Sequence, residues 1–170
     1  MRHTLSILVE NRYGELARIV GLFSARGYNI ESLTVAETLD PAISCVTMVT
    51  SGDDRTVEQI VKQVNKLVRV VKVSDLTGVS HFEREMVLIN VKAGNQIAFQ
   101  RVLQLVSQNQ MRVAEVMDDG LIIEATGKWE EMNELVRELM PFGIRGIVRT
   151  GAVALAKDST EETVGADLES

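Results

Sequence analysis

The sequence has one cysteine, two prolines and few aromatic residues, and its hydrophobic runs are short. Cys45 alone can form neither an internal disulfide nor a cysteine-based metal cluster. No stretch approaches the roughly 20 consecutive apolar residues of a membrane-spanning helix. The apolar run at the N-terminus is too short for a signal peptide. These absences predict a cytoplasmic protein that makes no membrane contact.

An excess of basic residues is also missing, because the 170 residues carry a net charge of −6. Residues 1–80 are balanced, whereas residues 157–170 hold one basic and five acidic side chains, for a charge of −4. Nucleic-acid binding depends on basic side chains that neutralise phosphates, so no nucleic-acid partner is expected. A short polar acidic end is typical of a disordered tail, which we expect at 157–170.

Recognisable catalytic motifs are lacking as well. The chain has no phosphate loop, no GxGxxG and no HExxH. The two histidines, His3 and His81, have no evident partner and are expected at a surface or a strand edge. The adjacent Asp118 and Asp119 precede a glycine and predict a turn rather than a metal pair, and Cys45 is expected as a small core residue. Catalysis by this chain alone is therefore not expected.

Hydrophobic spacing is the main positive signal, and it predicts strand, helix, strand, strand, helix, strand twice over. In the first copy the strands are 4–9, 29–38, 43–50 and 70–76. The first helix is 15–26, and a second, capped by Asp53 or Asp54, has one apolar face formed by Val57, Ile60, Val61, Val64 and Val68. In the second copy the strands are 86–91, 112–117, 121–126 and 144–150. Its helices are marked by Phe99, Val102, Leu103 and Val106, and by Met132, Leu135, Val136 and Leu139.

This order predicts an α+β protein with two ferredoxin-like βαββαβ domains. We expect domains at 1–77 and 85–156, joined by a polar linker at 78–84. RNA-recognition modules share this fold, but the central strand at 43–50 has no aromatic residue on which a base could stack. Each unit is small and leaves sheet edges and one face open, so we expect a homo-oligomer.

The segment from residue 8 to residue 33 predicts a binding site. Asn11 and Gly14 lie in a short turn between the first strand and the first helix, where free backbone N–H groups can hold a carboxylate. Gly14 lets a ligand approach the amides of Glu15 and Leu16. The Asn11 and Asn29 side chains can donate to a carboxylate or accept from an ammonium group. A small amino acid is thus a candidate ligand, although asparagine and glycine are also frequent in ordinary turns.

The same segment resembles a known family. Residues 4–33, TLSILVENRYGELARIVGLFSARGYNIESL, are similar to the ACT domain that opens the regulatory (small) subunits of acetolactate synthase, also called acetohydroxyacid synthase. The run GLFSARGYNIESLTV at 21–35 is especially characteristic of that family. The similarity continues through KQVNKLVRVVKVSDL and HFEREMVLINVKA, and covers roughly residues 1–156.

The resemblance implies a non-catalytic subunit that acts on a partner. The family's small subunit binds a large catalytic subunit, raises its activity and confers feedback inhibition by valine in branched-chain amino-acid biosynthesis. Thiamine diphosphate, magnesium and FAD belong to the large subunit, so no cofactor, metal or catalytic residue is expected here. An alternative is a stand-alone ACT sensor of amino acids that regulates another protein, although no helix-turn-helix is appended.

The resemblance also implies where valine binds. In the family, ACT domains pair side by side into an eight-stranded sheet, and the effector lies at the interface of this homodimer. Ala36 matches a supporting position near the interface. The matching effector positions are Asn11, Gly14, Glu15 and Leu16 of one chain, with Asn29 and Ile30 of the other.

Overall fold

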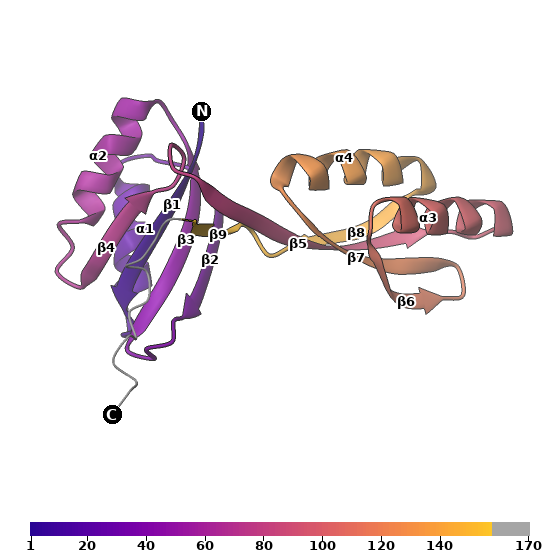
Figure 1. The fold of residues 1–170 in the computed structure, drawn as a ribbon, viewed down its shortest axis with the longest axis horizontal. Helices are drawn as coiled ribbons and strands as arrows, with labels where there is room; N and C mark the ends of the chain where they lie inside the picture. Colours follow the sequence, from indigo (N-terminus) through magenta and orange to yellow (C-terminus); the bar gives the residue numbers. More distant parts are fainter. Residues whose placement is uncertain (158–170) are drawn as a thin grey trace. The chain divides into compact units, whose positions relative to one another are not determined.

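The computed structural model describes residues 1–157, which form two compact units. The first unit contains Met1–Phe82 and residues 152–157, and the second contains Glu83–Gly151. Figure 1 shows that each unit has a β-sheet with two helices over one face. Among residues 1–157, no helix has the length and apolar character needed to cross a bilayer.

The first unit has the predicted βαββαβ order, and its antiparallel sheet has the strand order β2-β3-β1-β4. Strands β1 and β3 are therefore central, and β2 and β4 form the edges. The bounds are β1 Arg2–Glu10, α1 Glu15–Ala25, β2 Ile30–Glu37, β3 Ile43–Ser51, α2 Asp54–Val64 and β4 Val70–Asp75.

The core of the first unit follows from alternation along the central strands. Leu5, Ile7 and Val9 of β1 point toward the helices, and residues of β3, α1 and α2 complete the cluster. Helix α2 begins where Asp53 predicted a cap, because its side chain accepts from the Thr56 backbone N–H at 2.6 Å.

The second unit repeats the pattern. The bounds are β5 His81–Lys92, α3 Gln96–Gln108, β6 Arg112–Met117, β7 Gly120–Gly127, α4 Trp129–Leu139, a 3₁₀ turn at Met140–Phe142, and β8 Ile144–Arg149. The strand order β6-β7-β5-β8 is equivalent to that of the first unit. The centre of its core is formed by residues of the two middle strands: Val87, Ile89 and Val91 of β5, and Leu121 and Ile123 of β7. The prediction of two ferredoxin-like units is thus confirmed.

The helices and strands differ from the prediction at two places. Residues 81–84 of the expected linker are the first part of β5, because a strand that the sequence did not predict, β9 (Val153–Ala156), pairs with β5 and satisfies its backbone. Val68 lies beyond the end of α2 and is exposed rather than part of the apolar face. Except for Lys157, the expected acidic tail at 157–170 lies outside the described residues.

Candidate functional site

The turn between β1 and α1 has the geometry of a carboxylate site. Gly14 is the N-cap of α1 with φ of 86°, a left-handed conformation that glycine adopts freely, and a Cβ built there would meet nothing within 4 Å. No side chain caps this helix. Within residues 1–157, no group accepts from the N–H groups of Leu16 and Ala17. These two donors and the positive end of the helix dipole can therefore hold an anion.

Glu15 is held at the start of α1 by both its backbone and its side chain. Its backbone N–H donates to the Arg12 carbonyl at 3.3 Å, so that amide already has a partner. Its side chain is buried, with Oε1 3.1 Å from Nη1 of Arg18 and 3.5 Å from Nε of Arg69. The free amides are thus those of Leu16 and Ala17, and Glu15 anchors the start of the helix through two arginines.

Asn11 is held by the end of β2 and by the loop that follows it. Its Nδ2 donates to Oε1 of Glu37 at 2.9 Å and to the carbonyl of Pro41 at 3.0 Å. Its backbone N–H donates to the Ala42 carbonyl at 2.7 Å. Both side-chain N–H groups are therefore occupied, and Oδ1 remains as an acceptor, which suits an ammonium group better than a carboxylate.

The structure brings Asn11, Gly14 and Leu16 together but places Asn29 and Ile30 elsewhere. Asn29 lies beyond the opposite end of α1, and the 11 residues of this helix span about 16 Å. Its carbonyl accepts from Oγ1 of Thr50 at 2.6 Å. One small ligand cannot contact both groups within one chain.

Ala36 lies near the far end of β2, beside Cys45 in the register with β3. Ile30 is half-buried and packs against the core. Cys45 is only partly buried and its Sγ lies 3.9 Å from Oγ of Ser6, so it is not the core residue that its sequence position predicted.

An open hollow of about 620 Å³ beside this turn is lined by Asn11, Arg12, Tyr13 and Arg69. Its size falls in the range of about 300–1,000 Å³ typical of small-ligand sites. Arg12 and Arg69 were not among the predicted site residues. Arg69 follows α2 in the sequence, and the pairing of the Glu10 N–H with its carbonyl brings it to the turn. No local pattern in the sequence identifies such a neighbour.

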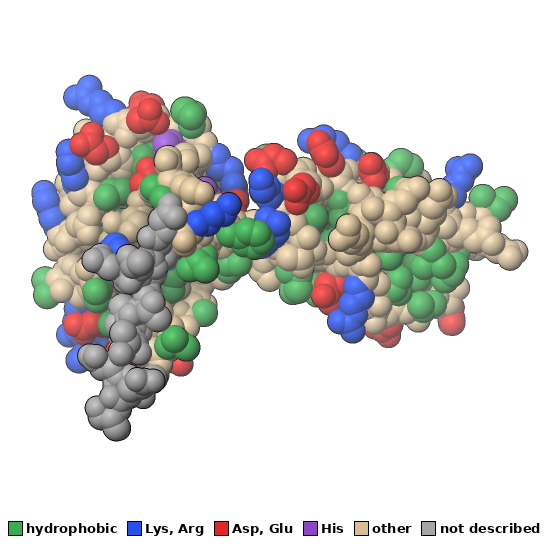
Figure 2. Space-filling model, viewed as in Figure 1, with side chains coloured by type: hydrophobic (Ala, Val, Ile, Leu, Met, Phe, Trp, Pro, Cys, Tyr) green, Lys and Arg blue, Asp and Glu red, His purple; other side chains and the backbone are tan. Residues whose placement is uncertain are grey.

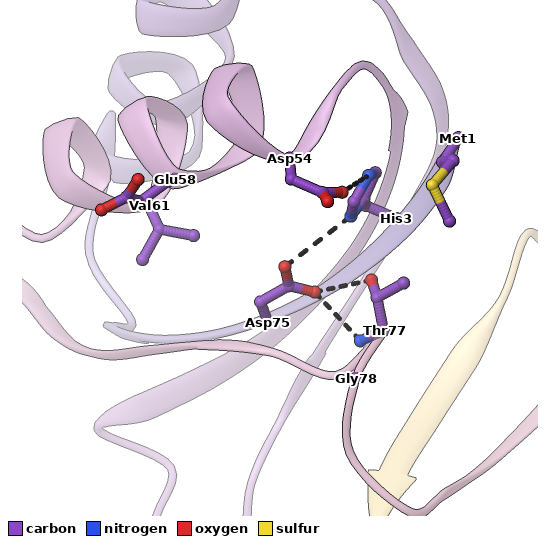
Figure 3. A pocket seen from close by; sticks show the side chains of 8 residues that line it. All are labelled: Met1, His3, Asp54, Glu58, Val61, Asp75, Thr77 and Gly78. Atoms are coloured by element: carbon purple, nitrogen blue, oxygen red, sulfur yellow. Dashed lines mark hydrogen bonds and ion pairs between the residues drawn. The ribbon is translucent and has the colours of Figure 1, made fainter.

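A second hollow of about 490 Å³ surrounds His3, which is buried rather than at a surface or strand edge as expected. Figure 3 shows the ring between two acidic side chains. Nε2 lies 3.7 Å from Oδ1 of Asp54, and Nδ1 lies 3.7 Å from Oδ2 of Asp75. Asp75 also accepts from the N–H and Oγ1 of Thr77. The arrangement joins β1 to α2 and β4 through the buried ring of His3.

Among residues 1–157, no group of three His, Cys, Asp or Glu side chains could hold a metal ion. Asp119 lies in the predicted turn and pairs with Arg145, whose Nη1 is 2.7 Å from Oδ1. Figure 2 shows acidic and basic side chains mixed on the visible face of each unit, without a continuous basic patch.

The chain matches known families over nearly all of the described residues. Residues 5–72 match the family described as an AHAS small subunit-like ACT domain, and residues 84–158 match the family described as the small subunit of acetolactate synthase.

Curated relatives agree with these matches. A probable acetolactate synthase small subunit from Archaeoglobus fulgidus is 42% identical over 92% of this chain and 98% of its own. The acetolactate synthase small subunit from Aquifex aeolicus is 41% identical over 92% of this chain and 82% of its own.

Solved structures agree as well. The acetolactate synthase small subunit from Thermotoga maritima is 37% identical, with a TM-score of 0.83 over 92% of this chain and 98% of its own. The chain therefore belongs to the family of acetolactate synthase small subunits, and its first unit is an ACT domain of that family.

Proposed function

We propose that this chain is the regulatory subunit of an acetolactate synthase, that it activates the large catalytic subunit, and that it makes that enzyme sensitive to valine. The observation that carries the proposal is the start of α1. There Gly14 leaves two backbone N–H groups free beside an Asn11 whose remaining polar atom is an acceptor. Donors for a carboxylate next to an acceptor for an ammonium group match the two ends of an α-amino acid.

The second half of the proposed site comes from another copy of the chain. β2 is an edge strand with Asn29 just before its first residue and Glu37 at its last. Glu37 contacts Asn11, so the two ends of β2 correspond to the two halves of the site. Antiparallel pairing of two β2 edges about a two-fold axis would bring Asn29 of the partner subunit toward Asn11 and Gly14. Valine would then lie between the subunits of a homodimer.

The energies required are moderate. Valine has about eight non-hydrogen atoms, so a binding free energy of about −6 to −7 kcal/mol stays within the limit of about −1.5 kcal/mol per atom for small ligands. A ligand that bridges two chains binds their paired arrangement better than the separated one, which is the differential contact that allostery requires. A coupling of about 1–3 kcal/mol would change the activity or affinity of the partner about 5- to 150-fold.

The reaction itself belongs to the proposed partner. We place thiamine diphosphate, magnesium and FAD in the large subunit, which condenses two pyruvates or pyruvate with 2-oxobutyrate. The small chain contributes the effector site and the contact through which effector binding changes the activity of the large subunit. Effector binding would stiffen or reorient the paired ACT domains, and the catalytic subunit would respond to that change.

Two measurements test this proposal. Titration calorimetry of the full chain with valine, leucine and isoleucine should show binding of valine, and its absence would refute the effector assignment. The large subunit of the same organism, assayed with pyruvate, should gain activity on addition of the chain and lose it again with valine. A stand-alone sensor would bind an amino acid but leave that activity unchanged, and a pull-down would recover a different protein.

A further inference from the structure

The orientation of the Asn11 side chain depends on Glu37, which is not among the predicted effector positions. A primary amide has two N–H donors and one carbonyl oxygen. In this structure one N–H meets Oε1 of Glu37 at 2.9 Å and the other meets the carbonyl of Pro41 at 3.0 Å. With two acceptors, the amide plane is fixed and Oδ1 is the only atom left for a ligand.

The two acceptors differ in what holds them in position: one is a backbone carbonyl in a hydrogen-bonded loop, and the other is a side chain. Pro41 lies in the loop between β2 and β3, which is held by its own hydrogen bonds: Asp40 Oδ1 accepts from the Ala42 N–H at 2.8 Å, and the Thr38 N–H donates to the Ile43 carbonyl at 2.9 Å. Glu37 is the last residue of edge strand β2, and it accepts the hydrogen bond through its side chain rather than its backbone. It is therefore the acceptor that a substitution can remove while the loop stays in place.

Loss of the Glu37 carboxylate would change what Asn11 offers to a ligand. With only the Pro41 carbonyl as an anchor, the amide can rotate about χ2, and one N–H becomes available to an incoming carboxylate. The site would then accept an acid that lacks an amino group more readily. The negative charge of Glu37 close to Oδ1 also favours a cationic group over an uncharged one.

We propose that Glu37 is a positioning residue that makes the effector site selective for α-amino acids over carboxylic acids of the same carbon skeleton, by holding Asn11 with its carbonyl toward the ligand. The inference rests on the proposed function, since it concerns the same site. It adds the chemical basis on which that site distinguishes valine from related acids without nitrogen.

The test compares the binding of L-valine and of 3-methylbutanoate, which is valine without its amino group, by titration calorimetry of the full chain. The variants are Glu37→Ala, which removes the acceptor, and Glu37→Gln, which keeps an acceptor oxygen but removes the charge. Glu31→Ala is the matched control, because Glu31 is an exposed glutamate of the same strand that bonds Ser51 rather than Asn11.

We expect the preference for valine over 3-methylbutanoate to fall about 2- to 12-fold in Glu37→Ala, the equivalent of one net hydrogen bond. Glu37→Gln should restore most of the preference, and Glu31→Ala should leave it unchanged. If Glu37 had only a structural role, Glu37→Ala would weaken the binding of both ligands equally and leave the ratio of their affinities unchanged.

The outcomes separate the two proposals. If the native chain binds valine in preference and Glu37→Ala keeps the same ratio, Glu37 has no positioning role and the effector site stands. If the native chain binds neither ligand, the proposed function is refuted and this inference with it. Should Glu37→Ala not fold, Glu37→Thr, whose hydroxyl is too short to reach Asn11 and whose β propensity suits an edge strand, carries the same comparison.

Discussion

The carboxylate of Glu15 and the guanidinium of Arg69 meet 3.5 Å apart at the start of α1, although 54 residues separate them in the sequence. Glu15 is buried, and Arg69 also lies 3.7 Å from Glu10 on β1. One arginine from the loop after α2 therefore fixes the end of β1 and the first residue of α1. The free amides of the candidate site depend on that fixed position.

Arg69→Ala should therefore destabilise the protein and loosen the site. We expect the free energy of unfolding to fall by about 1–3 kcal/mol, because a sheltered carboxylate loses one of its two partners. Urea denaturation monitored by circular dichroism measures this change. Arg18→Ala removes the other, more exposed partner and should cost less than about 1 kcal/mol. Equal effects of the two substitutions would contradict this role of Arg69.

Gly14→Asp should abolish valine binding, since its carboxylate would occupy the anion site at the free amides. Space for the side chain exists, and the left-handed backbone adds strain of about 1–2 kcal/mol. The matched control is Gly14→Asn, which has nearly the same shape, tolerates φ of 86° and has no charge. Calorimetry with valine decides: normal binding by Gly14→Asp would show that the anion site lies elsewhere.

Asn29→Ala should weaken valine binding by about 2- to 12-fold while the chain still activates the catalytic subunit. The observed bond of Asn29 is made by its backbone carbonyl to Thr50, and the substitution leaves that bond in place. Calorimetry gives the affinity, and pyruvate turnover by the large subunit with saturating small subunit gives the activation. Loss of activation together with affinity would indicate a structural role for Asn29.

Val35→Lys should weaken the proposed dimer. Val35 is an apolar residue, 41% exposed, on edge strand β2, and a lysine there would oppose pairing with a second β2. Val71→Lys is the control, because Val71 is 54% exposed on the opposite edge strand, β4. Multi-angle light scattering should show dissociation for the first variant alone. An unchanged mass for Val35→Lys would argue against pairing through β2.

Asp119→Asn should lower stability at neutral pH but have a smaller effect in acid. The hydrogen bond from Arg145 holds the pKa of Asp119 below its usual value of 3.8, and the same contact raises the pKa of Arg145. The carboxylate therefore stabilises the fold above the pKa of the unfolded chain, and this contribution is lost as the pH falls through the lower, folded value. The difference in melting temperature between variant and native chain should shrink below about pH 4. Asp118→Asn, without such an arginine partner among the described residues, should show no comparable trend.

Local patterns were sufficient to predict most of the fold. The alternation of core residues along β1 and β3, the cap at Asp53 and the Asp-Gly turn before β7 depend on neighbours within a few residues. The structure contains all three. Strand β9 was missed because four residues with weak alternation become a strand only through pairing with β5. Such pairing is a tertiary property that no short window contains.

The residues of the candidate site likewise fall into those that a local pattern predicts and those that only the folded structure brings together. Gly14 and Asn11 could be recognised from the strand, turn and helix order around them. The burial of His3 between two carboxylates and the pairing of Glu15 with Arg69 could not, since each joins elements that are distant in the sequence. The partners of Asn11, at Glu37 and Pro41, likewise depend on how the β2–β3 loop folds back onto the first turn.

The return of β9 to the first unit has a consequence for how the chain folds during its synthesis on the ribosome. The Ala152 N–H donates to Oγ of Ser32, and the Lys157 N–H donates to the Ser80 carbonyl, so residues on both sides of the second unit complete the first. A ribosome that adds about 5–20 residues per second needs roughly 4–15 s to proceed from Phe82 to Lys157. During that interval the nascent ACT domain has all four strands of its sheet but lacks these two hydrogen bonds, and the second unit is synthesised in full before they can form.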